Sequence, residues 1–211
     1  MLAQEPVLAS TEEAGVSALL LALYHGHAEV MAAIREHRRE LSVWEAAATG
    51  STEELARSIE ADPTLVDAFA PDGFTPLGLA AFFHRPEAVA WLIDHGADVD
   101  AASRNDFRVA PLHSAVAGRG HAAIARRLVE VGADVNVRQR HGWTPLHGAV
   151  HMGDADLVRL LLARGGDPRA ATDDGQTALD MAKALGRHQI AKILSTDEAN
   201  DDLNQGRLER A

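Results

Sequence analysis

Histidines are the residues of this chain whose type and spacing most readily suggest chemistry. Among eleven histidines, His147 and His151 are four residues apart, a spacing that places two imidazoles on one face of a helix. His25 and His27 are also close in the sequence. Zinc sites are commonly built from Cys ligands or a His-Glu-x-x-His motif, and the chain has neither. We therefore expect no metal site.

A glycine-rich stretch and two pairs of acidic residues are the other candidates. Gly118 to Ala123 reads Gly-Arg-Gly-His-Ala-Ala, which matches the Gly-x-Gly-x-x-Ala fingerprint of dinucleotide sites. That fingerprint requires a strand before it within a βαβ unit, whereas apolar residues at helical spacing lie on both sides here. The pairs Asp98/Asp100 and Asp154/Asp156 fall in turns, and we interpret them as solvated surface. We predict no cofactor and no enzymatic activity.

The elements that position these residues come from a unit repeated every 33 to 35 residues. Starts of the unit are marked by Thr75-Pro76-Leu77, Ala110-Pro111-Leu112, Thr144-Pro145-Leu146 and Thr177-Ala178-Leu179, whose leucines are 35, 34 and 33 residues apart. Ends are marked by Gly96-Ala97-Asp98, Gly132-Ala133-Asp134 and Gly165-Gly166-Asp167. Self-similarity at this period is typical of a helical repeat array.

Each unit contains the signals of two short helices. Thr75, Thr144 and Thr177 suit the N-cap, because a hydroxyl can accept from the unpaired N–H groups of the first turn. Proline follows at the first helical position in three units, where a missing N–H does no harm. Gly153 and Gly165 fall where helix ends need a left-handed residue. Two short helices cannot bury both apolar faces alone, so the units must stack.

The unit resembles the ankyrin repeat, whose Thr-Pro-Leu-His-x-Ala signature is matched best at Thr144 to Ala149. The resemblance covers residues 41–194, with a weaker match over 15–40. It implies an all-α, ankyrin-type helical solenoid of about six stacked helix pairs with short β-turn fingers. It also implies that buried imidazoles of His113 and His147 tie turns together. Trp44 is assigned to the position where the family usually has His.

We expect a single ankyrin-repeat domain over residues 1–194, followed by an acidic polar tail over 195–211. Ser10 and Glu13 are read as a capping box that opens a degenerate first pair. The expected parts are an N-terminal cap pair at 10–40, repeats at 41–70, 71–104, 105–138 and 139–172, and a C-terminal cap repeat at 173–194. The helix pairs are expected at 16–25 and 28–36, 42–49 and 52–60, 76–84 and 86–95, 111–118 and 121–131, 145–151 and 155–163, and 178–185 and 188–194.

One finger and one helix depart from the regular period. Gly96 to Leu112 spans 16 residues, against 14 in the equivalent intervals, so the finger between the third and fourth repeats is about two residues longer. The fourth repeat also has one extra residue between Leu112 and Gly120. Neutral drift in a loop and remodelling around a bound partner both explain these insertions.

Charge and composition narrow the classes of partner and compartment. The net charge of −11 argues against nucleic acid, which requires a cationic surface. Much of the negative charge lies near the two ends of the chain rather than on the repeats. The apolar run Leu19 to Leu23 is too short to cross a membrane, and residues 1–14 lack the pattern of a signal peptide. With no Cys, we expect a cytoplasmic protein that does not bind membranes.

The resemblance implies that partners bind to the finger tips and to the exposed side of the first helices. Carried over residue by residue, it predicts a concave aromatic and Arg-bearing face for another protein. The predicted partner-binding residues are Phe74, Phe82, Phe83, Phe107, Arg108, Arg140, His141, Trp143, His151 and Met152. We expect a non-catalytic protein–protein interaction module or adaptor, whose partner offers an acidic segment with an aromatic or apolar anchor.

Several alternatives to this interpretation stay open at the level of sequence. Phe82 and Phe83 could instead pack under the neighbouring finger, and the acidic tail Asp197 to Asp202 could occupy the face in place of a partner. A regulatory protein that binds a small molecule or anion at the Arg-rich fingers is the second functional class. An enzyme with its active site in the groove is the third. The chain is expected to be a monomer or a weak homo-oligomer.

Overall fold

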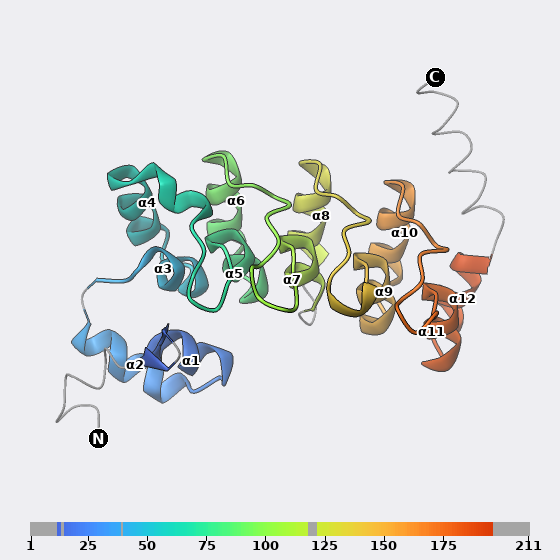
Figure 1. The fold of residues 1–211 in the computed structure, drawn as a ribbon, viewed down its shortest axis with the longest axis horizontal. Coiled ribbons are helices and arrows are strands. Elements are labelled where there is room, and N and C mark those ends of the chain that lie inside the picture. The colour runs from blue at the N-terminus through green and yellow to red at the C-terminus, as the bar shows by residue number, and fades with distance from the viewer. Residues whose placement is uncertain (1–11, 14, 39, 118–121, 196–211) are drawn as a thin grey trace. The chain divides into compact units, whose positions relative to one another are not determined.

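The computed structural model describes residues 12–13, 15–38, 40–117 and 122–195 (Figure 1). The predictions for Ser10, for the glycine-rich stretch 118–121 and for the tail after Ser195 lie outside these residues. The chain divides into two compact units, Met1–Asn105 and Asp106–Ala211, and each is described by itself. The expected limits of the ankyrin domain and its tail stay a prediction.

The first unit contains three helix pairs in its described part. Two-residue strands, β1 (Glu12–Glu13) and β2 (Val16–Ser17), pair antiparallel before the first helix. The helices are α1 (Ala18–Tyr24), α2 (Ala28–His37), α3 (Val43–Thr49), α4 (Thr52–Ala61), α5 (Pro76–Phe82) and α6 (Pro86–Asp94), with a 3-10 helix η3 (Pro63–Asp67) after α4 (Figure 1). The first helices α1 and α5 each pack against α3, so successive pairs stack.

The second unit repeats this arrangement. Its helices are α7 (Pro111–Ala117), α8 (Ala122–Glu130), α9 (Pro145–Met152), α10 (Ala155–Ala163), α11 (Ala178–Ala184) and α12 (His188–Ser195), with a 3-10 helix η4 (Arg140–Gly142) before α9. The first helices α7, α9 and α11 pack against one another in sequence. The predicted fold class, an all-α ankyrin-type helical repeat, is confirmed.

Every expected helix pair is present in the described residues, with small differences at the ends. The first helix begins at Ala18 rather than Val16, because the hydroxyl of Ser17 accepts from the backbone N–H of Leu20 as an N-cap. Helix α5 ends at Phe82 rather than His84, since His84 has a left-handed φ of 56° that ends a helix.

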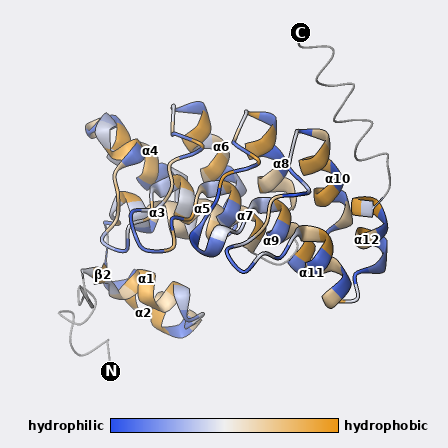
Figure 2. Cartoon of the chain, turned by 45° about the vertical axis from the view of Figure 1, so that its right-hand side comes forward, coloured by the Kyte–Doolittle hydropathy of each residue, from blue (hydrophilic) through white to orange (hydrophobic). Residues whose placement is uncertain are grey.

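The core is made of small and medium apolar side chains on the inner faces of these helices. Leu77, Leu79 and Ala80 are fully buried in α5, as Ala149 and Val150 are in α9. Hydrophobic residues lie mainly on the helices in Figure 2, whereas the connecting loops are mainly hydrophilic. Full burial of one Leu side chain is worth about 1.5–3 kcal/mol, so several per helix stabilise a helix of seven residues that would not form alone.

All three predicted threonines are N-caps in the structure. The hydroxyl of Thr75 accepts from the N–H of Gly78 at 3.1 Å, and that of Thr177 accepts from Asp180 at 3.2 Å. The hydroxyl of Thr144 lies 2.9 Å from Nδ1 of His147. In each case the residue that meets the cap is the third residue of the helix.

In α3 this third residue is Glu45, and the assignment of Trp44 to the family's His position is wrong. Ser42 is the N-cap of α3, so counting from the cap places Glu45 where His147 lies in α9. Trp44 is one residue earlier and donates from its indole N–H to the Ala68 carbonyl at 2.8 Å.

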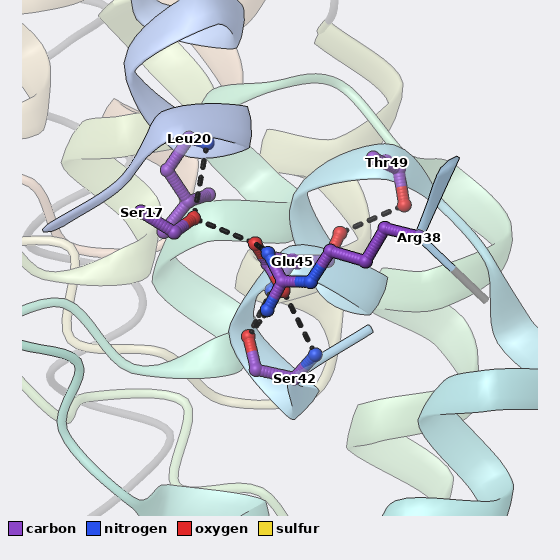
Figure 3. A network of polar contacts seen from close by, with 6 residues as sticks. All are labelled: Ser17, Leu20, Arg38, Ser42, Glu45 and Thr49. Carbon is purple, nitrogen blue, oxygen red and sulfur yellow. Dashed lines mark hydrogen bonds and ion pairs between the residues drawn. The ribbon is translucent and has the colours of Figure 1, made fainter. Parts of the chain in front are cut away.

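Glu45 has no exposed surface and is held by partners from two helix starts (Figure 3). Its carboxylate accepts from the N–H and hydroxyl of Ser42, both at 2.9 Å, which completes a capping box. It also accepts from the hydroxyl of Ser17 at 2.6 Å and forms an ion pair with Arg38. Because Ser17 caps α1 and Arg38 follows α2, one buried carboxylate ties the first helix pair to the second.

The fingers of neighbouring repeats are joined by backbone hydrogen bonds. In the second unit the N–H of Arg140 donates to the Phe107 carbonyl at 2.8 Å, and the N–H of Asp173 donates to the His141 carbonyl at 3.0 Å. In the first unit the N–H of Arg104 donates to the Gly73 carbonyl at 2.9 Å. Each finger is therefore fixed by its neighbour within its unit.

The longer finger makes its contact differently. The side-chain amide of Asn105 donates to the Asp72 carbonyl at 2.8 Å, a bond that a backbone N–H makes between the regular fingers of the second unit. This substitution accommodates the extra residues after Gly96. It also brings the backbone close to Gly73, whose φ is 88° and whose missing Cβ would lie 2.8 Å from the Asn105 nitrogen.

Substitution of Gly73 by Ala is therefore expected to destabilise the fold by about 2–4 kcal/mol, through left-handed strain and a clash with backbone. Gly175 is the matched control, because its φ of 78° is similar but nothing lies within 4 Å of the point that a Cβ would occupy. Gly175→Ala should cost only about 1 kcal/mol. Urea unfolding measures both, and equal losses would contradict the close approach of the longer finger.

The Glu45 network generates a second expectation. Glu45→Gln removes the buried charge opposite Arg38 and should lower the free energy of unfolding by about 3 kcal/mol. Glu53→Gln, an exposed change in the first turn of α4, should change it by less than about 0.5 kcal/mol. Chemical denaturation of the two variants checks this, and a Glu45 variant as stable as the control would disprove the anchoring role.

Candidate functional site

Three aromatic side chains of the first unit form one cluster. The ring centroid of Tyr24 lies 5.8 Å from that of Phe82 and 5.1 Å from that of Phe83. Phe82 and Phe83 meet edge to face at 5.1 Å. Phe82, at the end of α5, is 37% exposed, whereas the other two rings are half-buried. The cluster therefore presents apolar surface to solvent while its rings hold one another in place.

A hydrogen bond fixes this cluster to the adjacent finger. The hydroxyl of Tyr24 donates to Asp72 at 2.8 Å, and the second carboxylate oxygen of Asp72 accepts from the N–H of Phe74 at 3.2 Å. Burial raises the pKa of the Tyr24 hydroxyl above its ordinary value, and the charge of Asp72 and this bond act in the same direction. The hydroxyl therefore stays protonated, so the finger bearing Phe74 is held to α1.

In the second unit the finger tips carry an exposed ring and two exposed arginines. Phe107 is 57% exposed, and the guanidinium carbon of Arg140 lies 5.5 Å from its ring centroid. Arg108 and His141 are also exposed, and both have left-handed backbone, with φ of 51° and 63°. An aromatic ring beside a guanidinium group provides apolar and cationic surface at the same place.

The start of α9 adds a further aromatic group. The ring of Trp143 is half-buried and lies 6.0 Å from that of His151 and 6.1 Å from that of His147. His151 is exposed near the end of α9, and Met152 is half-buried beside it in the sequence. The predicted residues Trp143 and His151 are therefore brought together on one helix and its N-cap region.

His113 and His147 hold the fingers above them, as the resemblance implies. Nδ1 of His147 lies 3.3 Å from the backbone nitrogen of Thr144 and accepts its N–H, so Nε2 carries the proton and donates to the Gln176 carbonyl at 3.2 Å. Nε2 of His113 lies 3.2 Å from the Trp143 carbonyl in the same way. Burial lowers the pKa of both imidazoles, that of His113 from 6.5 to about 4.

These histidines predict how stability depends on pH. Between pH 6.5 and about 4 the unfolded chain binds a proton at His113 that the folded chain does not. The contribution of His113 to the free energy of unfolding is therefore complete above pH 6.5. It falls by about 1.4 kcal/mol for each pH unit below that value. His113→Gln should flatten this slope in denaturation series from pH 7 to 4. His188→Gln, which removes an exposed imidazole, should leave the slope unchanged. Parallel slopes for wild type and His113→Gln would contradict the buried neutral imidazole.

The chemistry open to the described residues is limited. Both ring nitrogens of His147 are used by Thr144 and Gln176, so the pair His147/His151 cannot bind a metal together. No group of three His, Cys, Asp or Glu with metal-binding geometry occurs among the residues that the structure describes. Within the same residues, no helix has the length and apolar character needed to cross a membrane.

The structure therefore brings the predicted binding residues together in separate groups within each unit. Phe82 and Phe83 meet Tyr24, and Phe74 joins them through Asp72; Phe107 meets Arg140, and Trp143 meets His151. The alternative of burial under a finger does not describe Phe82, which is 37% exposed, and it stays open for the half-buried Phe83. Sequence reasoning missed Glu45, although Ser42 three residues earlier is the ordinary signal of a capping box.

Comparison with known proteins places this arrangement in a family. A family model described as ankyrin repeats (3 copies) matches residues 43–139 and 112–205, which is well over half of the chain. The chain belongs to the ankyrin repeat family. The ankyrin match includes both the Phe74–Phe83 segment and the fingers at Phe107 and Trp143.

Curated relatives share the ankyrin repeats over part of their length. Neurogenic locus notch homolog protein 1 of Danio rerio is 31% identical over 137 residues, which are 65% of this chain and 6% of the relative. Ankyrin repeat and SOCS box protein 16 of Mus musculus is 38% identical over 115 residues, 51% of the chain and 25% of the relative. Protein phosphatase 1 regulatory subunit 27 of Mus musculus is 42% identical over 73 residues, which are 35% of this chain and 47% of the relative. The chain spans less than half of each of these relatives.

Proposed function

We propose that this chain is a non-catalytic protein–protein interaction module that binds a partner on the aromatic and Arg-bearing surface of its fingers and first helices. Membership of the ankyrin repeat family supports a binding role. One similar protein is named as a regulatory subunit of protein phosphatase 1, and a regulatory subunit acts by binding another protein. We also propose a cytoplasmic location, which the absence of Cys in the sequence favours.

The observation that carries this proposal is the exposure of large aromatic side chains on rigid supports. Phe82 packs against Tyr24 and Phe83. The backbone carbonyl of Phe107 accepts a hydrogen bond from the backbone N–H of Arg140 in the next finger. Aromatic residues and Arg dominate the energetics of protein interfaces, and exposed apolar patches mark contact surfaces. A surface that is already ordered loses little conformational entropy on binding, so few anchors suffice.

The charges around these rings favour an acidic partner segment with an aromatic or apolar anchor. Arg108 and Arg140 form no ion pair within the described residues, whereas Arg138 already has Asp173 at 3.8 Å. Carboxylates of the partner would form hydrogen-bonded ion pairs with the two exposed guanidinium groups. The overall charge of −11 disfavours nucleic acid as the ligand. The chain would act as a monomer or a weak homo-oligomer.

Affinity capture from the source cell, followed by measured affinities, tests the proposal. Phe83→Ala and Arg140→Glu should each lower the affinity for the captured partner at least tenfold, about 1.4 kcal/mol, because each removes part of the proposed contact surface. Arg159→Glu is the matched control, since Arg159 is an exposed arginine on the second helix α10. Circular dichroism establishes that each variant is folded. A partner that binds both site variants as tightly as wild type would refute the proposed surface.

A further inference from the structure

One finger tip of the second unit lacks the glycine that the other fingers have. The residue three positions before the first helix has left-handed backbone in every finger. In three fingers it is a glycine: Gly73 with φ 88°, Gly142 with 72° and Gly175 with 78°. Before α7 it is Arg108, with φ 51°. The chain therefore has an arginine at a backbone position that favours glycine.

This arginine costs stability and forms no hydrogen bond or ion pair within the described residues. A non-glycine residue in the left-handed region costs about 1 kcal/mol. The Arg108 side chain is exposed, and among the described residues it takes part in no hydrogen bond or ion pair. Backbone strain without an internal compensation points to a role outside the folded chain.

The groups around Arg108 are suited to bind a carboxylate that lies next to an apolar side chain. Phe107, the preceding residue, is 57% exposed. The backbone of Arg140 donates to the Phe107 carbonyl at 2.8 Å, and its guanidinium lies over the same ring. The acidic residues of these fingers and the next one are Asp106, which precedes Phe107, Asp173, which is paired with Arg138, and Asp174. Two guanidinium groups without ion pairs thus belong to fingers joined at one exposed ring.

We propose that Arg108, acting with Arg140, determines the specificity of the module for acidic partner segments. This inference rests on the proposed function and assigns its selectivity to one finger tip. The planar guanidinium of Arg108 would bind an Asp or Glu carboxylate of the partner with two parallel hydrogen bonds. The ring of Phe107 would cover an apolar side chain next to that carboxylate. The ligand is a peptide segment of another protein with acidic residues on either side of an apolar one.

The substitution Arg108→Gly separates this role from a structural one. Glycine relieves the left-handed strain, so the melting temperature should rise, whereas loss of a structural contact would lower it. The probe is a fluorescent 15-residue peptide of Glu and Asp with a central Leu; its twin has Lys in place of every acid. Wild type should bind the acidic peptide at least tenfold more tightly than the basic twin, and less tightly at high salt. Arg108→Gly should lower the affinity for the acidic peptide at least fivefold.

Two further variants sharpen the result. Arg108→Lys keeps the charge but not the planar fork, so its affinity should fall between those of wild type and Arg108→Gly. Arg159→Gly removes an exposed arginine away from the fingers and should leave peptide affinity unchanged. Equal affinity of wild type and Arg108→Gly, equal affinity for the two peptides, or no binding of the acidic peptide at about 1 mM would each overturn the inference.

The outcomes also separate this inference from the proposed function. If Phe83→Ala and Arg140→Glu lose the captured partner while Arg108→Gly retains it, the binding surface stands and the selectivity of Arg108 is refuted. If inorganic phosphate at equal ionic strength displaces the acidic peptide completely while uncharged peptide analogues never compete, the site recognises a free anion rather than a peptide segment. That result would also overturn the inference.

Discussion

A buried polar side chain at the third position of α3, α7 and α9 is the constraint on which the rest of the structure depends. A helix of seven residues is not stable alone in water, so α3, α7 and α11 exist only because their ends and faces are tied to neighbours. At this position His113 and His147 join a helix start to the finger of the next repeat, and Glu45 joins α3 to the cap of α1. All three are buried, and a buried polar group must be paired, so the same residues specify how successive pairs stack.

Finger order, and therefore the candidate binding surface, follows from this constraint. His113 holds the carbonyl of Trp143, which fixes the finger that carries Arg140 and His141. That finger in turn holds the carbonyl of Phe107. In the first unit the Tyr24–Asp72 bond does the same for Phe74 and for the rings of Phe82 and Phe83. Exposed aromatic and cationic groups are thus supported by buried neutral imidazoles and by the hydroxyl of the half-buried Tyr24.

Much of the fold follows from sequence because its signals are local. Thr-Pro starts, glycine breaks and apolar spacing each depend on a few adjacent residues, so the helix pairs and the longer finger could be predicted. The Glu45 network could not, because Ser17 and Arg38 reach it only through packing of a pair that lacks a Pro to mark its register. Contact between Tyr24 and Phe82 likewise joins residues far apart in the chain. Arg108 was predicted as a binding residue, and its left-handed backbone could have been found by counting three residues back from Pro111, where the other fingers have glycine.

Hydrogen–deuterium exchange of the full chain, with and without its captured partner, tests the central claim most directly. The proposed surface predicts slower exchange in the partner complex at the fingers 72–74, 106–109 and 139–143 and at the ends of the first helices, 82–83 and 151–152. Exchange in the second helices α6, α8 and α10 should stay as it is in the free chain. Protection confined to those second helices, with unchanged fingers, would contradict the assignment of binding to the aromatic and Arg-bearing surface.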